Sequence, residues 1–156
     1  MTKIVDINEL ENFVGEVTGT SEWFQVTQDQ ISLFADATHD HQFIHIDPER
    51  AADTMFGSTI AHGFLTLSML SHLAIDCMIT IPDPEMVINY GLDTVRFMSP
   101  VKVDKRIRAV CKLVDVQVKG AGKRALCKYD ISIEIEGEKR PAMNAEWLMM
   151  FMAKKK

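Results

Sequence analysis

The sequence predicts an α+β protein in which an antiparallel β-sheet wraps around one long, central α-helix. Helical patterns fill the first half of the chain, and strand patterns fill the second half. Between them lies an almost continuously apolar stretch from Phe64 to Ile81. Runs of helices followed by runs of strands are typical of the α+β class, because the two kinds of element then form separate layers.

The helical half begins with short elements. The stretch from Ile7 to Phe13 has the pattern of an amphipathic helix, and Trp23 to Val26 has that of a short strand. Thr27 then matches the cap of a helix, and Gln30 three residues later completes a capping box. We expect this helix to fade at Thr38.

A polar loop follows from His39 to His45. Behind it, Asp47 and Pro48 match a helix start, because aspartate is a favoured N-cap and proline is tolerated at the first helical position. We expect this short helix to end near Met55. The polar residues that interrupt the apolar stretch after it favour a buried helix over a membrane span.

In the strand-rich half, apolar and polar residues alternate, as they do in strands with one buried face. Turn residues at 120–123 and 136–139 predict hairpins. Four long strands are expected: Met86–Met98, Lys105–Val118, Arg124–Glu136 and Met143–Met152.

Composition and charge narrow the range of functions. A chain of 156 residues, 47% hydrophobic and 25% charged, fits a single domain over residues 1–156. A net charge of −5 without a basic stripe weighs against nucleic-acid binding, and the lysines at 154–156 are expected to be a solvated tail. Three cysteines without disulfide or metal spacing, and no signal-peptide pattern, predict a cytoplasmic protein.

The polar loop and the start of the apolar helix carry residues suited to hydration of a double bond. Adding water to an α,β-unsaturated thioester requires a base, a proton relay and a hydrogen-bond donor for the enolate oxygen. Asp40 and His45 lie five residues apart on one loop and can close on a single water molecule. Gly63 can present an unpaired backbone N–H at the helix start. Each feature alone also has an ordinary structural explanation.

Several other residues have two interpretations each. Ser71 is either a plain helix serine or a group that orients the loop carboxylate. His62 is either a buried, hydrogen-bonded structural histidine or a substrate contact. Met55 and Phe56 are candidates for an acyl tunnel, although methionine is more often core filling. Arg96 is a candidate for binding nucleotide phosphates, although exposed charges are usually only solvated.

The loop also holds a cluster that suggests a metal site at first sight. It consists of His39, His41, His45 and Asp47. The cluster lacks the helical histidine spacing of zinc enzymes, so we expect no metal here.

As a whole, the segment resembles the motif of the MaoC-like (R)-specific enoyl-CoA hydratase family. The matching residues are Asp40, His45, Asp47-Pro48 and Ala61-His62-Gly63. The resemblance continues through the apolar helix and Val95-Arg96-Phe97, and covers about residues 21–152. As a combination the motif is specific, unlike its parts.

The resemblance implies a single hot-dog domain that acts as a homodimer, with coenzyme A held partly by the neighbouring subunit. It implies syn hydration of trans-2-enoyl-CoA to (R)-3-hydroxyacyl-CoA, without a metal or redox cofactor and without a membrane partner. Asp40 and His45 would take the acid/base roles and Gly63 the oxyanion role, and Phe43 would join the substrate contacts. It fixes neither acyl chain length nor the thioester carrier.

Two positions depart from the family pattern. Gln42-Phe43 stands where many members have Asn-Pro, but one branch has glutamine followed by an aromatic residue, so we interpret it as a subfamily feature. His39 stands where glycine often precedes the aspartate. If that position needs a positive φ, histidine tolerates it better than most residues.

Two other functions stay open. A hot-dog acyl-CoA thioesterase would attack the carbonyl, often with one carboxylate and no paired histidine. A non-catalytic acyl-CoA-binding hot-dog subunit would need no complete set of Asp40, His45 and Gly63. The intact set favours hydration over both.

Overall fold

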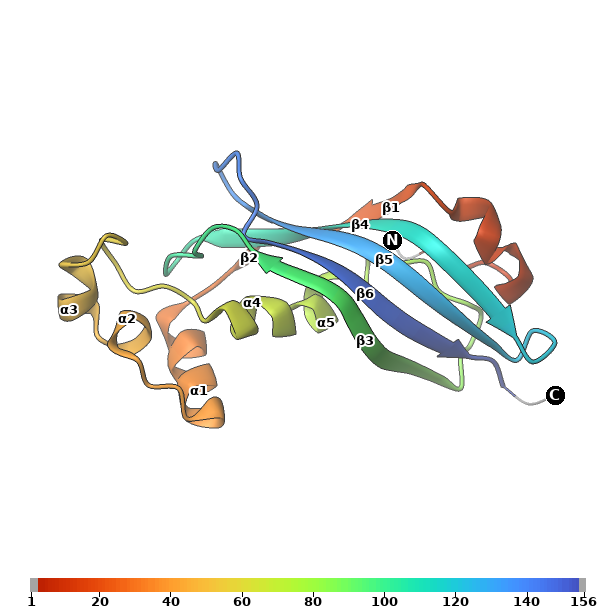
Figure 1. The fold of residues 1–156 in the computed structure, drawn as a ribbon, viewed down its shortest axis with the longest axis horizontal. Coiled ribbons are helices and arrows are strands. Elements are labelled where there is room, and N and C mark those ends of the chain that lie inside the picture. The colour runs from red at the N-terminus through yellow and green to blue at the C-terminus, as the bar shows by residue number, and fades with distance from the viewer. Residues whose placement is uncertain (1–2, 155–156) are drawn as a thin grey trace.

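The computed structural model describes residues 3–154 and confirms an α+β fold built on one antiparallel sheet (Figure 1). Residues 155–156 of the lysine tail lie outside the described part. The elements are η1 (Ile7–Phe13, a 3-10 helix), β1 (Val17–Thr20), β2 (Phe24–Gln25), α1 (Gln28–Thr38), α2 (Phe43–Ile46), α3 (Pro48–Ala52), α4 (Gly63–Ser68), α5 (Leu70–Leu73), β3 (Met86–Phe97), β4 (Arg106–Lys119), β5 (Arg124–Ile135) and β6 (Met143–Met152).

The sheet has the strand order β1-β4-β5-β6-β3, and β2 also pairs with β4. Every pairing between named strands is antiparallel. Buried residues alternate with less buried ones along β4, β5 and β6, as the sequence pattern predicted. Their inner side chains build the main core with residues of η1, α4 and α5. The four long strands therefore match the prediction to within one residue at each end.

Strand β3 differs from the other long strands. It pairs with β6 along one side, and its other side is an unpaired edge of the described sheet. Its residues are exposed on both faces, apart from Gly91 and Val95, which are half-buried. Large apolar side chains are among the exposed ones: Met86, Val87, Ile88, Tyr90, Leu92 and Phe97.

The central helix is much shorter than predicted. Helices α4 and α5 run under the sheet (Figure 1), but α5 ends at Leu73 and the chain turns before Ile81. One face also stays open, since Phe64 and Ser68 are exposed. The prediction of one helix over residues 64–81, buried all round, was therefore wrong.

The end of the apolar run, at Ile79 and Thr80, is hydrogen-bonded to other parts of the chain. Thr80 pairs with the N-terminal segment: its N–H donates to Lys3, and its carbonyl accepts from Val5, over 2.9 and 3.0 Å. The Tyr129 hydroxyl also donates to the Ile79 carbonyl over 3.0 Å. Because these bonds require extended backbone, the helix cannot continue through Ile79 and Thr80, and this part of the apolar run is irregular chain in the core.

Helices α1, α2 and α3 form a helical projection (residues 27–62) that extends beyond the end of the sheet (Figure 1). The predicted starts are confirmed: Thr27 and Gln30 form a complete capping box, and Asp47 caps α3 with Pro48 in its first turn. Helix α3 ends at Ala52, slightly before the predicted end.

Both ends of the projection are fixed to one short stretch of chain, residues 101–107. At the entry, β2 pairs with the start of β4, and Val26 N–H donates to Lys105 over 2.9 Å. At the exit, Ala61 N–H donates to Val101 over 2.7 Å, and Ile60 bridges Lys102. The projection therefore leaves the sheet and returns to it at the same place.

Two further findings concern the described chain as a whole. Among residues 3–154, no helix has the length and apolar character needed to cross a membrane. All three cysteines are free thiols and buried, and Cys77 and Cys111 lie in contact with their sulfurs 3.3 Å apart. Cysteines far apart in sequence are thus neighbours in the core.

Candidate active site

His45 is held from several directions in the short helix α2. Its side chain is 7% exposed, and Nδ1 lies 2.7 Å from the Ile60 carbonyl. A carbonyl only accepts, so Nδ1 carries the hydrogen and Nε2 keeps its lone pair. The His45 backbone carbonyl accepts from Gln28 Nε2 over 2.8 Å, and Thr59 donates to the Gln28 amide oxygen over 2.6 Å.

Burial sets the protonation of this imidazole. It lowers the pKa of His45 below its ordinary value, and the charge of His62 adds to that direction. The Ile60 carbonyl and Asp40 oppose it by raising the pKa. The net lowering favours the neutral form, which is the form able to accept a proton at Nε2.

Asp40 lies just after helix α1, in the helical projection. Its residue is exposed, and Oδ1 accepts from Gln42 N–H over 3.4 Å. The preceding residue, His39, ends α1 in the left-handed region with φ of 61°. This is the conformation in which the family glycine would be favoured, and the turn that it makes leads the chain out of α1 to Asp40.

Asp40, His45 and His62 come together. One ligand-type atom from each lies within 4.8 Å of the others, and the rings of His45 and His62 stack with centroids 3.8 Å apart. This set is the candidate for holding a metal ion. The absence of a metal here stays an expectation from the sequence. Side-chain atoms this close can also contact one shared water molecule, which is the use that an acid/base pair would make of them.

Gly63 starts helix α4 beside a cavity of about 270 Å³. The cavity is also lined by His45, Phe56, Thr66 and Phe97. The side chain of His62, the N-cap residue, makes no capping bond, and the first N–H groups of a helix have no partner within it. A Cβ at Gly63 would lie 3.1 Å from Cε1 of Phe97, so any larger residue here would press on that ring.

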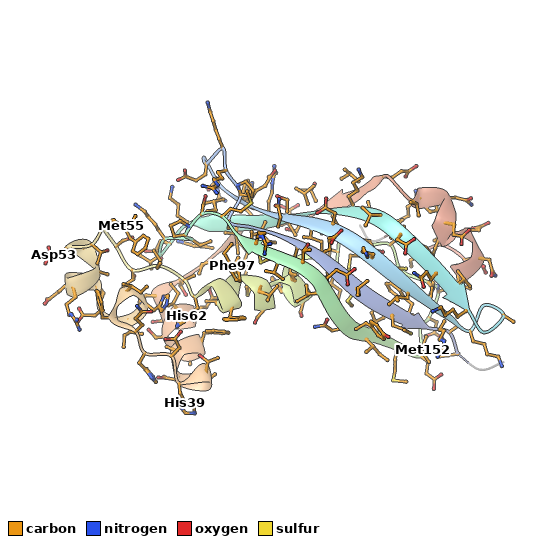
Figure 2. All side chains as sticks on the ribbon, in the orientation of Figure 1. His39, Asp53, Met55, His62, Phe97 and Met152 are labelled. Atoms are coloured by element: carbon orange, nitrogen blue, oxygen red, sulfur yellow. The ribbon has the colours of Figure 1, made fainter. Side chains whose placement is uncertain are left out.

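The other predicted site residues do not all gather there. Phe56 lines the cavity, but Ser71 lines a different cavity between α5 and the sheet, with Trp147. Met55 is 92% exposed near the outer end of the projection (Figure 2) and does not line the His45 cavity, so its place in an acyl tunnel stays a prediction. Figure 2 also shows His62 between the projection and the sheet.

Phe43 and Arg96 are likewise absent from the lining of the His45 cavity. The Phe43 ring instead faces the Arg50 guanidinium at 4.2 Å. Arg96 is exposed on β3, where Nη1 donates to the neighbouring Val95 carbonyl over 3.2 Å. Their substrate roles remain predictions that concern contacts outside this cavity.

Sequence reasoning missed four residues that shape the site. Phe97 and Thr66 line the cavity, and Gln28 and Thr59 hold His45. Phe97 had been noted only as part of a family motif. Thr66 follows Gly63 by three residues, so helical spacing could have placed it on the same face. No local signal pointed to Gln28 or Thr59.

Solved structures of similar shape define the class of fold. The R-hydratase PhaJ1 of Pseudomonas aeruginosa superposes with a TM-score of 0.74 at 21% identity, covering 98% of this chain and 89% of that one. The (R)-hydratase of A. caviae gives 0.69 at 22% identity, covering 86% and 95%. At these identities the likeness shows the fold alone, which is the hot-dog fold predicted from the sequence.

Sequence comparison shows the family. Residues 9–134 match the MaoC like domain, and the chain belongs to the MaoC-like dehydratase family. The 3-hydroxyacyl-thioester dehydratase Z of Mycobacterium tuberculosis is 44% identical over 153 residues, 98% of this chain and 100% of the relative. Nodulation protein N of Rhizobium leguminosarum bv. viciae is 50% identical over 145 residues, 92% and 89%. Membership supports a hydro-lyase activity in general.

Proposed function

We propose that this protein is an (R)-specific enoyl-CoA hydratase, which adds water to trans-2-enoyl-CoA by syn addition to give (R)-3-hydroxyacyl-CoA. The observation that carries the proposal is the position of His45, which lies beside Asp40 and also lines, with Gly63, the cavity at the start of α4. A relative named 3-hydroxyacyl-thioester dehydratase supports the same chemistry, since hydration and dehydration share one transition state.

The proposed reaction uses His45 and Asp40 as an acid/base pair on one water molecule. The Ile60 carbonyl holds His45 with Nε2 unprotonated, so this atom can take a proton as the water oxygen attacks C3. The Asp40 carboxylate accepts the second hydrogen of that water and orients it. The protonated His45 then gives this proton to C2 on the same face, so that the elements of one water molecule are added without oxidation or reduction.

Gly63 is proposed to stabilise the charge that forms on the thioester oxygen. As C3 is attacked, electron density moves through C2 to the carbonyl, and a backbone N–H directed at that oxygen lowers the barrier. Phe97 lies against Gly63 and limits the space there. The chemistry needs no redox cofactor or metal, and coenzyme A enters as part of the substrate.

We further propose that the working unit is a homodimer, formed along the open edge of β3. A long edge strand with exposed apolar side chains is a ready site for pairing with another chain. Phe64 adds to this surface from α4. A neighbouring subunit would cover it and supply part of the coenzyme A site. With three free buried thiols, we place the protein in the cytoplasm.

Enzymatic assay tests the reaction. The protein is incubated with trans-2-enoyl-CoA esters of increasing chain length, and the 3-hydroxyacyl product is analysed on a chiral column. We expect the (R) product. Release of free CoA thiol without hydration would instead identify a thioesterase, and binding without turnover would identify a non-catalytic subunit.

Light scattering after size-exclusion chromatography tests the dimer. We expect Ile88→Arg, on β3, to give monomers, because a buried unpaired charge opposes association. Val17→Arg is the matched control, since Val17 is exposed on β1, away from the β3 edge. If the dimer persists in Ile88→Arg and is lost in Val17→Arg, the interface lies at β1 and not at β3.

A further inference from the structure

His62 has features that the proposed reaction does not use. Its side chain is 3% exposed, and Nε2 lies 3.0 Å from the Asp40 backbone carbonyl. Because that carbonyl only accepts, Nε2 carries the hydrogen in the neutral ring. Nδ1 is then an acceptor, and it has no hydrogen-bond partner within residues 3–154. A buried polar atom without a partner is uncommon and calls for an explanation.

The ring of His62 contacts both halves of the proposed acid/base pair. It stacks on His45 with an interplanar angle of 23° and a centroid distance of 3.8 Å. Its Nε2–H holds the backbone of Asp40, as described above. The Phe34 ring packs against it at 5.0 Å, so helix α1 fixes its position in turn. A single side chain thus links two residues five positions apart on the loop.

The contact between His62 and His45 also has an electrostatic effect. Two imidazoles in stacking contact do not both hold a proton readily, since like charges at this distance repel in a buried setting. The charged groups that face His45 are His62, which lowers its pKa, and Asp40, which raises it. The remaining polar contacts of His45, from Gln28 and Ile60, carry no charge.

We propose that His62 is a positioning residue for hydration: it aligns Asp40 with His45 and opposes protonation of His45. This rests on the proposed function, but the alignment and the charge coupling can be measured without turnover. His62 itself donates no proton to substrate. It acts through the ring on which it stacks and the carbonyl that it binds.

Two substitutions separate these contributions. His62→Phe keeps a flat ring against His45 and removes the N–H and the charge. His62→Gln keeps an amide donor for the Asp40 carbonyl and removes the ring and the charge. His72→Gln is the control, since His72 is an imidazole in α5 that packs on Phe24 instead of on the site.

Turnover and its pH profile form the first readout. We expect both His62 variants to lower kcat by about 10-fold or more with a smaller change in KM, because alignment affects the transition state more than binding. We also expect the acid limb of the profile to move to higher pH, since His45 protonates more readily without its neighbour. A merely structural histidine would lower activity without moving that limb.

Histidine-labelled NMR spectra form the second readout and need no activity. In the wild type we expect His62 in the Nε2–H tautomer and His45 in the Nδ1–H tautomer. We expect His45 to titrate at higher pH in His62→Gln than in the wild type or the His72→Gln control. The wild-type measurement stands even if a His62 variant does not fold.

The outcomes distinguish the two proposals. An inactive wild type with the expected tautomers and the expected shift of the His45 titration would overturn the hydratase function and leave the coupling of the two histidines standing. An active wild type whose His62 variants keep both kcat and the acid limb would overturn the role of His62. A His62 ring that carries its proton on Nδ1 would overturn it as well.

Discussion

The sheet and the helical projection bury different kinds of side chain. In β4, β5 and β6 the inner positions are apolar, with Ile107, Ile131 and Met143 fully buried. In the projection, buried residues include His45, Thr59 and His62, which are polar. Burying polar groups costs free energy unless they are hydrogen-bonded, and these three side chains have such partners. The sheet thus holds most of the apolar core, and the projection holds Asp40, His45 and His62.

The largest expected effect is on activity and comes from the projection. Asp40→Asn and His45→Gln should each lower kcat for hydration by at least about 100-fold, the usual scale of acid–base catalysis. Steady-state kinetics with a trans-2-enoyl-CoA measure this, with circular dichroism as the check on folding. Asp36→Asn is the control: it removes an exposed carboxylate of α1 that pairs with His41. Near-normal turnover in either site variant would remove the acid/base assignment.

Stability should respond most to the sheet. Ile131→Ala creates a cavity among the inner residues of β5 and should lower the free energy of unfolding by about 2–5 kcal/mol. Leu33→Ala changes an exposed side chain of α1 and should cost about 0.5 kcal/mol or less. Urea unfolding measures both. Equal losses in the two variants would contradict the assignment of Ile131 to the core and of Leu33 to the surface.

The buried imidazole makes stability depend on pH. Because the pKa of His45 is lower in the folded chain, the unfolded chain binds more protons below its pKa of about 6.5. Neutral His45 therefore contributes to the free energy of unfolding above about pH 6.5. This contribution is lost as the pH falls below that value, by at most about 1.4 kcal/mol per pH unit. Thermal melting between about pH 7.5 and 5 measures the loss. In His45→Gln the pH dependence should be weaker; an identical slope would refute the assignment.

The smallest expected effect concerns the turn before Asp40. His39 has a φ of 61°, so His39→Gly should raise the free energy of unfolding by about 0.5–1 kcal/mol. Ala37→Gly, inside α1, should lower it by about 1 kcal/mol. Chemical unfolding of both gives opposite signs if backbone conformation is the cause. Loss of stability in His39→Gly would show that the imidazole makes contacts worth more than the strain.

Local signals in the sequence predicted the regular parts of this fold well. Alternation of apolar and polar residues placed β6 at Met143–Met152, and cap residues placed the starts of α1 and α3. Each of these signals comes from residues a few positions apart. Asp40 and His45 are also close in sequence, although His45 lies in helix α2 and not on the predicted polar loop.

Features set by distant residues could not be predicted. The apolar run after Gly63 could not show that Thr80 would pair with the N-terminal segment and end the helix. Strand β1 was missed because it is short, contains a glycine and pairs irregularly with β4. The contact between Cys77 and Cys111, and that between Gly63 and Phe97, joins elements far apart in the chain. Such contacts follow from packing, which no local pattern encodes.

The shared attachment of both projection ends to residues 101–107 has a consequence for change in this fold. An excursion that starts and finishes at one place can lengthen, shorten or be exchanged without altering strand order. Asp40, His45 and His62 would then be exchanged together as one segment, and the sheet would keep its strand order. Gly63 and Phe97 lie outside that segment, so an exchange confined to residues 27–62 would change the acid/base pair and keep the proposed oxyanion donor.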